Sequence, residues 1–179
     1  MLALITFTFA AAQNSMNAIF VTYLVTKFQI SLVLAGTAFS TMQITGMLTR
    51  VVLGWATDRF LSATKLLGII GLSIAIMFSI LALVEGTWSM TVVFVIAAAT
   101  GVFVGGWSGV SLAEIARVVD QKSVAIATSG TIFFSFLGAA VGPTLFSVLV
   151  ARTDSFNSAF LTIAAAAAFV GILVLVTQN

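Results

Sequence analysis

The chain has 179 residues, of which 61% are hydrophobic and only 7% are charged, against roughly 25% charged residues in soluble domains. So few polar groups cannot cover a soluble protein of this size, and the composition therefore predicts a membrane protein. The lack of Cys and His excludes thiol nucleophiles, imidazole bases and the usual soft-metal ligands, and a net charge of +2 is too small for nucleic-acid binding. We expect no enzyme, cofactor, metal ion or nucleic-acid partner.

Six apolar segments, separated by five short polar interruptions, follow one another along the chain. Each is close to the roughly 20 residues that a helix needs to cross a bilayer. They predict helices at about 2–26, 31–54, 65–84, 88–112, 123–150 and 157–177. The first segment resembles a signal peptide but lacks its positive start, so we interpret it as a transmembrane helix. Because the segments are apolar on every face, unlike β-barrel strands, we expect an all-α, polytopic membrane protein with a single domain over residues 1–179.

The basic residues are distributed unequally among the five connections. Five of the seven flank the second and fourth connections, namely Arg50, Arg59, Lys65, Arg117 and Lys122. The other two, Lys27 and Arg152, flank odd-numbered connections. Since basic residues near helix ends favour the cytoplasmic side, we expect both termini in the cytoplasm, and we expect the membrane to be a bacterial inner membrane.

The end of the second predicted helix carries an unusual stripe of Gly46, Arg50, Gly54 and Asp58, each four residues from the next. This spacing places them on one helical face. The glycines allow a neighbouring helix to approach closely, while Asp58 can accept hydrogen bonds from another helix's free amides and Arg59 can pair with an acid. Arg50, about one turn inside, can extend its charge toward the cytoplasm.

The stripe lies within "GMLTRVVLGWATDRF", which resembles the loop signature between the second and third helices of major facilitator superfamily transporters. Gly54, Asp58 and Arg59 match that signature, whereas its later Gly and Arg positions are not matched. In the fifth segment, "GAAVGP" resembles the core of the family's antiporter motif, so Gly138, Gly142 and Pro143 are candidates for close helix packing.

The resemblance covers nearly the whole chain as one six-helix half of a transporter. The fourth segment lacks the Arg that is usual in the first half of family members, so the chain is more similar to the C-terminal half. The resemblance implies a secondary active transporter that moves a small solute by alternating access, with a second six-helix half or another copy as partner. It also implies a cytoplasmic gating network of Asp58 and Arg59 with Glu114 and Arg117; the alternative is a solvated helix end that only fixes topology.

Polar residues within the predicted spans are candidates for lining a substrate cavity, because polar groups that face lipid are costly. Gln13, Asn14 and Asn17 lie near the middle of the first helix, and Trp107 and Ser111 lie in the fourth. Interhelical hydrogen bonding explains the three amides equally well, and Trp107 is also a residue that favours membrane interfaces.

The function therefore remains open between two classes. The chain is either part of a transporter or a noncatalytic membrane interaction protein that is derived from one. No carboxylate lies deep in a predicted span, which suits neutral or amphipathic solutes, although a partner half could supply an Arg for anions.

Overall fold

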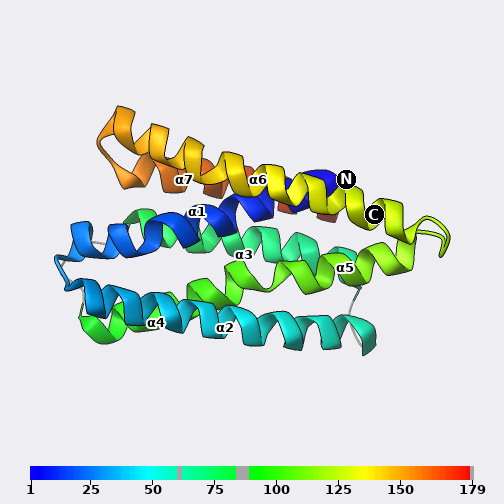
Figure 1. Cartoon of the computed structure of the whole chain (residues 1–179), viewed down its shortest axis with the longest axis horizontal. Coiled ribbons are helices and arrows are strands. Elements are labelled where there is room, and N and C mark those ends of the chain that lie inside the picture. The colour runs from blue at the N-terminus through cyan, green and yellow to red at the C-terminus, as the bar shows by residue number, and fades with distance from the viewer. Residues whose placement is uncertain (60–61, 84–88, 178–179) are drawn as a thin grey trace.

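The computed structural model (Figure 1) describes residues 1–59, 62–83 and 89–177, except that the side chains of Asp58 and Arg59 lie outside the described part. All regular structure in these residues is helical. The helices are α1 (Leu2–Phe28), α2 (Leu32–Arg59), α3 (Ala63–Leu83), α4 (Met90–Gly105), α5 (Trp107–Val118), α6 (Val124–Thr153) and α7 (Phe156–Val176).

These helices supply six segments that are long and apolar enough to cross a membrane, with α4 and α5 together forming the fourth. The all-α, six-span fold class is therefore confirmed. The fourth span differs from the continuous helix that the sequence predicts, because it is interrupted at Gly106. Glycine is unfavourable within a helix, and a Cβ at this position would lie 2.7 Å from the side chain of Leu53. The missing side chain of Gly106 thus lets α2 approach the span closely at this point.

Successive spans run in opposite directions along the bundle (Figure 1). Both termini lie toward the end at which α2 and α5 finish and α3 and α6 begin; we call this the termini end and the other the opposite end. Both α2 and α5 extend about five residues beyond the predicted 54 and 112. The predicted ends mark where the apolar residues stop, but a helix can continue through polar residues once it has left the bilayer core.

Glycines bring three pairs of helices together. The pairs with the most extensive contact are α1 with α6, α3 with α7 and α2 with α4. A Cβ added to Gly142 would lie 2.6 Å from the Cα of Ala11. A Cβ added to Gly71 would lie 2.8 Å from the Cα of Gly171, and one added to Gly105 would lie 2.6 Å from the Cα of Gly46. Because lipid supplies no hydrophobic force between helices, such close contacts between small residues hold a membrane bundle together.

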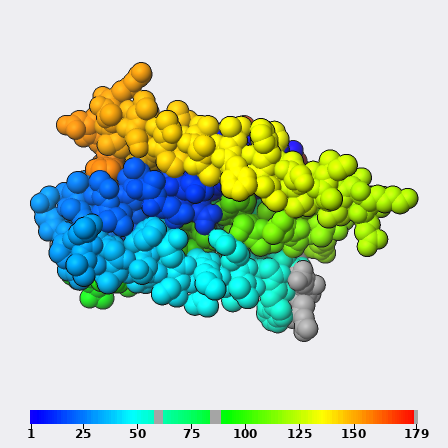
Figure 2. Space-filling model, in the orientation of Figure 1, coloured from blue at the N-terminus to red at the C-terminus, as the bar shows by residue number. Residues whose placement is uncertain are grey.

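The helices differ in how much of their surface the bundle covers. Within the most apolar 18 residues of each helix, 56% of the residues of α3 are buried, whereas only 22% of those of α2 and 17% of those of α6 are buried. Figure 2 shows α1 between α2 and α6 on one face of the molecule. Large apolar side chains such as Leu48, Val51, Phe133 and Phe136 are exposed on α2 and α6. These two helices therefore have surface left for lipid or for another protein.

A cluster of four aromatic rings packs between helices toward the opposite end of the bundle. The ring of Phe160 packs edge-on against Tyr23, Phe78 and Phe146, with centroids 5.0, 5.9 and 5.0 Å away. The Tyr23 hydroxyl donates a hydrogen bond of 2.8 Å to the carbonyl oxygen of Leu81. The cluster connects α1, α3, α6 and α7, and all four rings are buried.

Candidate functional site

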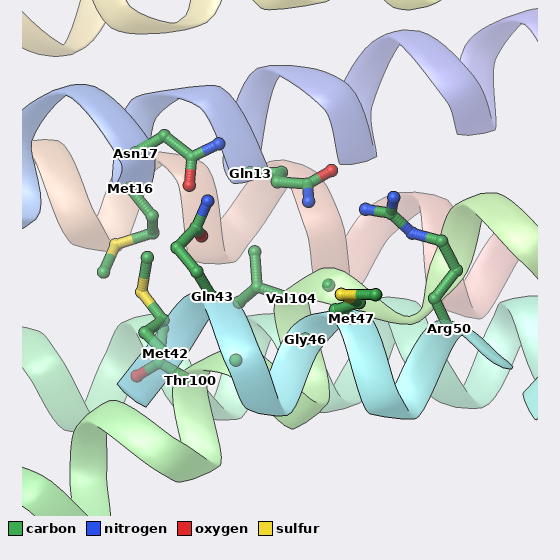
Figure 3. Close-up of a pocket in the computed structure, with 12 residues that line it drawn as sticks. Gln13, Met16, Asn17, Met42, Gln43, Gly46, Met47, Arg50, Thr100 and Val104 are labelled. Carbon is green, nitrogen blue, oxygen red and sulfur yellow. The ribbon is translucent and has the colours of Figure 1, made fainter. Parts of the chain in front are cut away.

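A cavity of about 300 Å³ lies between α1, α2 and α4 (Figure 3). Its lining residues are Gln13, Met16 and Asn17 from α1; Met42, Gln43, Gly46, Met47 and Arg50 from α2; and Thr100, Gly101, Val104 and Gly105 from α4. Most of them lie near the middle of their spans. The cavity therefore lies near the middle of the helices that are long and apolar enough to cross a membrane.

Helical periodicity explains why these residues meet. Gln43, Gly46, Met47 and Arg50 follow the spacing i, i+3, i+4 and i+7, which is one face of a helix. The α1 residues follow i, i+3 and i+4 in the same way. The close approach of α2 and α4 at Gly46 brings this face of α2 beside α4 and opposite α1.

The cavity combines polar and soft apolar groups. Figure 3 shows Gln43 and Arg50 pointing from α2 toward α1, while Gln13 and Asn17 point from α1 toward α2. Met16, Met42 and Met47 contribute thioether side chains. Amides and a guanidinium can orient a polar solute by hydrogen bonds, and the methionines adapt to its apolar surface.

Of the three amides that the sequence suggested on α1, two line this cavity. Gln13 and Asn17 do so, whereas Asn14 is turned about 100° away on the helix and donates a 2.9 Å hydrogen bond to the carbonyl oxygen of Ala10.

Trp107 and Ser111, the other two cavity candidates, lie behind the lining. Trp107 is only 6% exposed, and its indole N–H donates a 3.0 Å hydrogen bond to Oε1 of Gln13. Ser111 is 3% exposed, one turn further along α5. Trp107 thus contacts the cavity through Gln13.

Gln43 and Arg50 also line the cavity. The sequence predicts that Arg50 extends its charge toward the cytoplasm, and it predicts no role for Gln43. Their spacing from Gly46 could have identified both. Gln43 lies three residues before Gly46 and Arg50 lies four residues after it, so all three share the helical face that approaches another helix.

The predicted gating residues lie at the termini end. Glu114 is buried on α5 and accepts a hydrogen bond from the hydroxyl of Thr64, in the first turn of α3. Arg117 is exposed near the end of α5. Gly54 has open space where a Cβ would be. The side chains of Asp58 and Arg59, the other two candidates, lie outside the described residues.

The "GAAVGP" segment lies in α6 against α1. A Cβ at Gly138 would overlap the carbonyl oxygen of Phe7, and Gly142 lies against Ala11. Helix α6 continues through Pro143 to Thr153.

A second cavity, of about 510 Å³, lies between α1, α6 and α7. Its walls are almost entirely apolar, with Phe7, Leu145, Phe146 and Ile163 among them, and Arg152 at the opposite end. Because it offers few groups that could orient a polar solute, the cavity between α1, α2 and α4 is the candidate functional site.

The six candidate spans and the polar cavity between them define a polytopic membrane protein with room for a solute in its interior. Residues 2–179 match the model of the Major Facilitator Superfamily, and the chain belongs to this family. Members of the family are transporters that carry small solutes and reside in the lipid bilayer. Among the curated proteins compared with the chain, none matches it.

Proposed function

We propose that the chain forms one half of a secondary active transporter that moves a small solute by alternating access. The observation that carries this proposal is the polar cavity between α1, α2 and α4, near the middle of the spans. Polar side chains at this depth are costly unless they face a cavity or one another. Midplane sites between helical bundles are the usual binding sites of such transporters.

The incomplete burial of α2 and α6 supports a partner for this half. Both helices flank α1 on one face and carry exposed apolar side chains. The partner is either a second six-helix half, with this chain as the C-terminal one, or another copy of this chain. The rival proposal, a noncatalytic membrane interaction protein, uses the same surface without transport.

Alternating access predicts that the cavity is open to each side of the membrane in turn. The chain contains no native Cys, so a single introduced thiol can report access without background. Met47→Cys places the thiol on the cavity wall, at a position that is 69% exposed. We expect a membrane-impermeant maleimide to label it both in right-side-out and in inside-out vesicles.

Two loop variants serve as matched controls for sidedness. Ser31→Cys lies between α1 and α2 at the opposite end, and Ser123→Cys lies before α6 at the termini end; both serines are exposed. Each should be labelled in one vesicle orientation only, and with both termini cytoplasmic Ser123→Cys should react in inside-out vesicles. Labelling of Met47→Cys from a single side would favour the noncatalytic alternative.

The partner is identified by the size of the native polypeptide, measured by immunoblot of the source membrane with an antibody to residues 114–122. A band at roughly twice 18.7 kDa corresponds to a chain with two six-helix halves. A band at the mass of this chain requires a dimer, which crosslinking between exposed α2 positions such as Leu48→Cys should capture. A monomer would contradict the two-half proposal.

We also propose that Glu114 and Arg117 form a gate at the termini end with Asp58 and Arg59. Burial of Glu114 beside the start of α3 supports this role, because that end of α5 is then held against α3. Exchanging the charges of Arg59 and Glu114 should restore transport that either single reversal abolishes. Without such rescue, the two residues do not meet in the transport cycle.

A further inference from the structure

The cavity between α1, α2 and α4 carries a positive charge that no described residue of its wall balances. Twelve of the residues that the structure describes line it, and Arg50 is the one ionised residue among these twelve. A guanidinium remains protonated in proteins, and a charge within a membrane span is costly unless it has a function or a partner. An anion in the cavity would balance this charge.

The described carboxylates lie away from the cavity wall. Glu114 is buried on α5 and is bonded to Thr64. Asp120 is exposed beyond the end of α5, and Asp154 follows α6 at the opposite end. None of the three lines the cavity.

The Trp107 hydrogen bond determines which group Gln13 presents to the cavity. An indole N–H can only donate, so the oxygen of the Gln13 amide must face Trp107. The amide NH₂ group is then left for the cavity, and Figure 3 shows its nitrogen directed toward α2. Gln13 therefore acts as a hydrogen-bond donor, as Arg50 does, and two donors of this kind suit the oxygens of an oxyanion.

The rest of the wall suits an apolar body. Met16, Met42, Met47 and Val104 supply flexible or apolar side chains. A volume of about 300 Å³ is at the small end of ligand pockets, and one guanidinium balances one negative charge. We infer that the solute is a small organic monoanion, whose oxyanionic group binds Arg50 and the Gln13 amide while its apolar body contacts the methionines. This inference rests on the proposed function and specifies its substrate class.

The charge of the cavity is tested with two thiol reagents that differ in sign. Met47→Cys is treated with two methanethiosulfonate reagents, the anionic sulfonatoethyl and the cationic trimethylammonioethyl derivative. The ratio of their two reaction rates is compared with the ratio at Ser31→Cys in the α1–α2 loop, where the serine is exposed and its sequence neighbours are uncharged. We expect the cavity thiol to favour the anionic reagent at least about fivefold over the loop thiol, the effect of one unit charge about 4 Å away in water. Arg50→Gln should abolish the preference, and Arg50→Lys should retain it.

Binding is tested by protecting the same thiol with three probes that share one apolar body. Benzoate is anionic, benzamide is neutral and benzylammonium is cationic. Benzoate should slow the labelling of Met47→Cys, whereas the other two should not, and Arg50→Gln should weaken benzoate protection about tenfold or more. Equal protection by benzamide, no protection by benzoate, or protection that survives Arg50→Gln would overturn the inference.

The two proposals can fail separately. Labelling of Met47→Cys from one side alone, without any probe, contradicts alternating access. Two-sided labelling without an anionic preference or benzoate protection leaves the transporter proposal intact and contradicts the monoanion.

Discussion

The indole N–H of Trp107 donates a 3.0 Å hydrogen bond to the side-chain oxygen of Gln13. Trp107 is the first residue of α5, directly after the interruption of the fourth span at Gly106, and its ring packs edge-on against Phe9 of α1. The interruption and the cavity are thereby connected, because the residue that restarts the helix also fixes the amide that lines the cavity.

Trp107→Phe should weaken anion binding without unfolding the protein. Phe retains an aromatic ring beside Phe9 but cannot donate, so the Gln13 amide is free to rotate its oxygen toward the cavity. Loss of one hydrogen bond corresponds to about 1 kcal/mol, which is about fivefold in affinity. We expect the benzoate concentration that protects Met47→Cys to rise by that factor.

The reagent-charge ratio at Met47→Cys provides the internal control for this variant. Arg50 is unchanged, so the preference for the anionic reagent should persist in Trp107→Phe. A variant that lost both the preference and the protection would indicate general damage to the cavity, and unchanged protection would show that Gln13 does not depend on Trp107.

Among the polar residues that line the cavity, only those of the first helix could be predicted from the sequence. Gln13 and Asn17 are conspicuous, because amides are rare near the middle of an apolar segment. Arg50 lies close enough to a loop to be explained by topology, and whether it lines a cavity depends on how α2 rotates against α4. That rotation is set by the contact of Gly46 with Gly101 and Gly105, which no single segment specifies.

Gly142→Ala should destabilise the bundle, whereas Gly130→Ala in the same helix should not. At Gly142 the added methyl would lie 2.6 Å from the Cα of Ala11, so α1 and α6 must separate. At Gly130 nothing lies within 4 Å. Overpacking typically costs about 1–3 kcal/mol, while alanine in place of an exposed helical glycine gains up to about 1 kcal/mol.

Thermal unfolding in detergent, followed by size-exclusion chromatography, measures both glycine variants. We expect a lower midpoint for Gly142→Ala and an unchanged or higher one for Gly130→Ala. Equal midpoints would mean that α1 and α6 are not held together at Gly142.

The six spans themselves could be predicted because long apolar runs dictate helices in a bilayer. The interruption at Gly106 could not, since Gly101, Gly105 and Gly109 in the same segment remain helical. All four glycines lie against α2, so neither the glycines of this segment nor their contact with α2 singles out Gly106 as the point of interruption.

Thr64→Val should lower stability more than Thr144→Val. The Thr64 hydroxyl donates to the buried carboxylate of Glu114, whereas Thr144 is exposed and donates only to the carbonyl oxygen of Ala140 in its own helix. Removing a donor from a buried charged acceptor costs about 1–3 kcal/mol, and an exposed substitution usually stays within about 0.5 kcal/mol. Both changes are nearly isosteric, so a difference in unfolding midpoint reports the lost hydrogen bond. Equal midpoints would show that Thr64 does not stabilise Glu114.

The aromatic cluster at the opposite end should respond differently to loss of a hydrogen bond and loss of a ring. Tyr23→Phe removes the hydroxyl that donates to Leu81 but keeps the ring contacts, so we expect a cost of about 1 kcal/mol. Phe160→Ala removes the ring that touches Tyr23, Phe78 and Phe146. Truncation of a buried Phe costs about 3–5 kcal/mol.

Unfolding midpoints of these two variants, compared with that of Phe169→Ala, separate the contributions. Phe169 lies on the same helix as Phe160 but is 65% exposed on the bundle surface, so its truncation should have little effect. We expect Phe160→Ala to be the least stable and Tyr23→Phe to be intermediate. If Phe160→Ala were no worse than Phe169→Ala, the cluster would not be what joins α1, α3, α6 and α7 at this end.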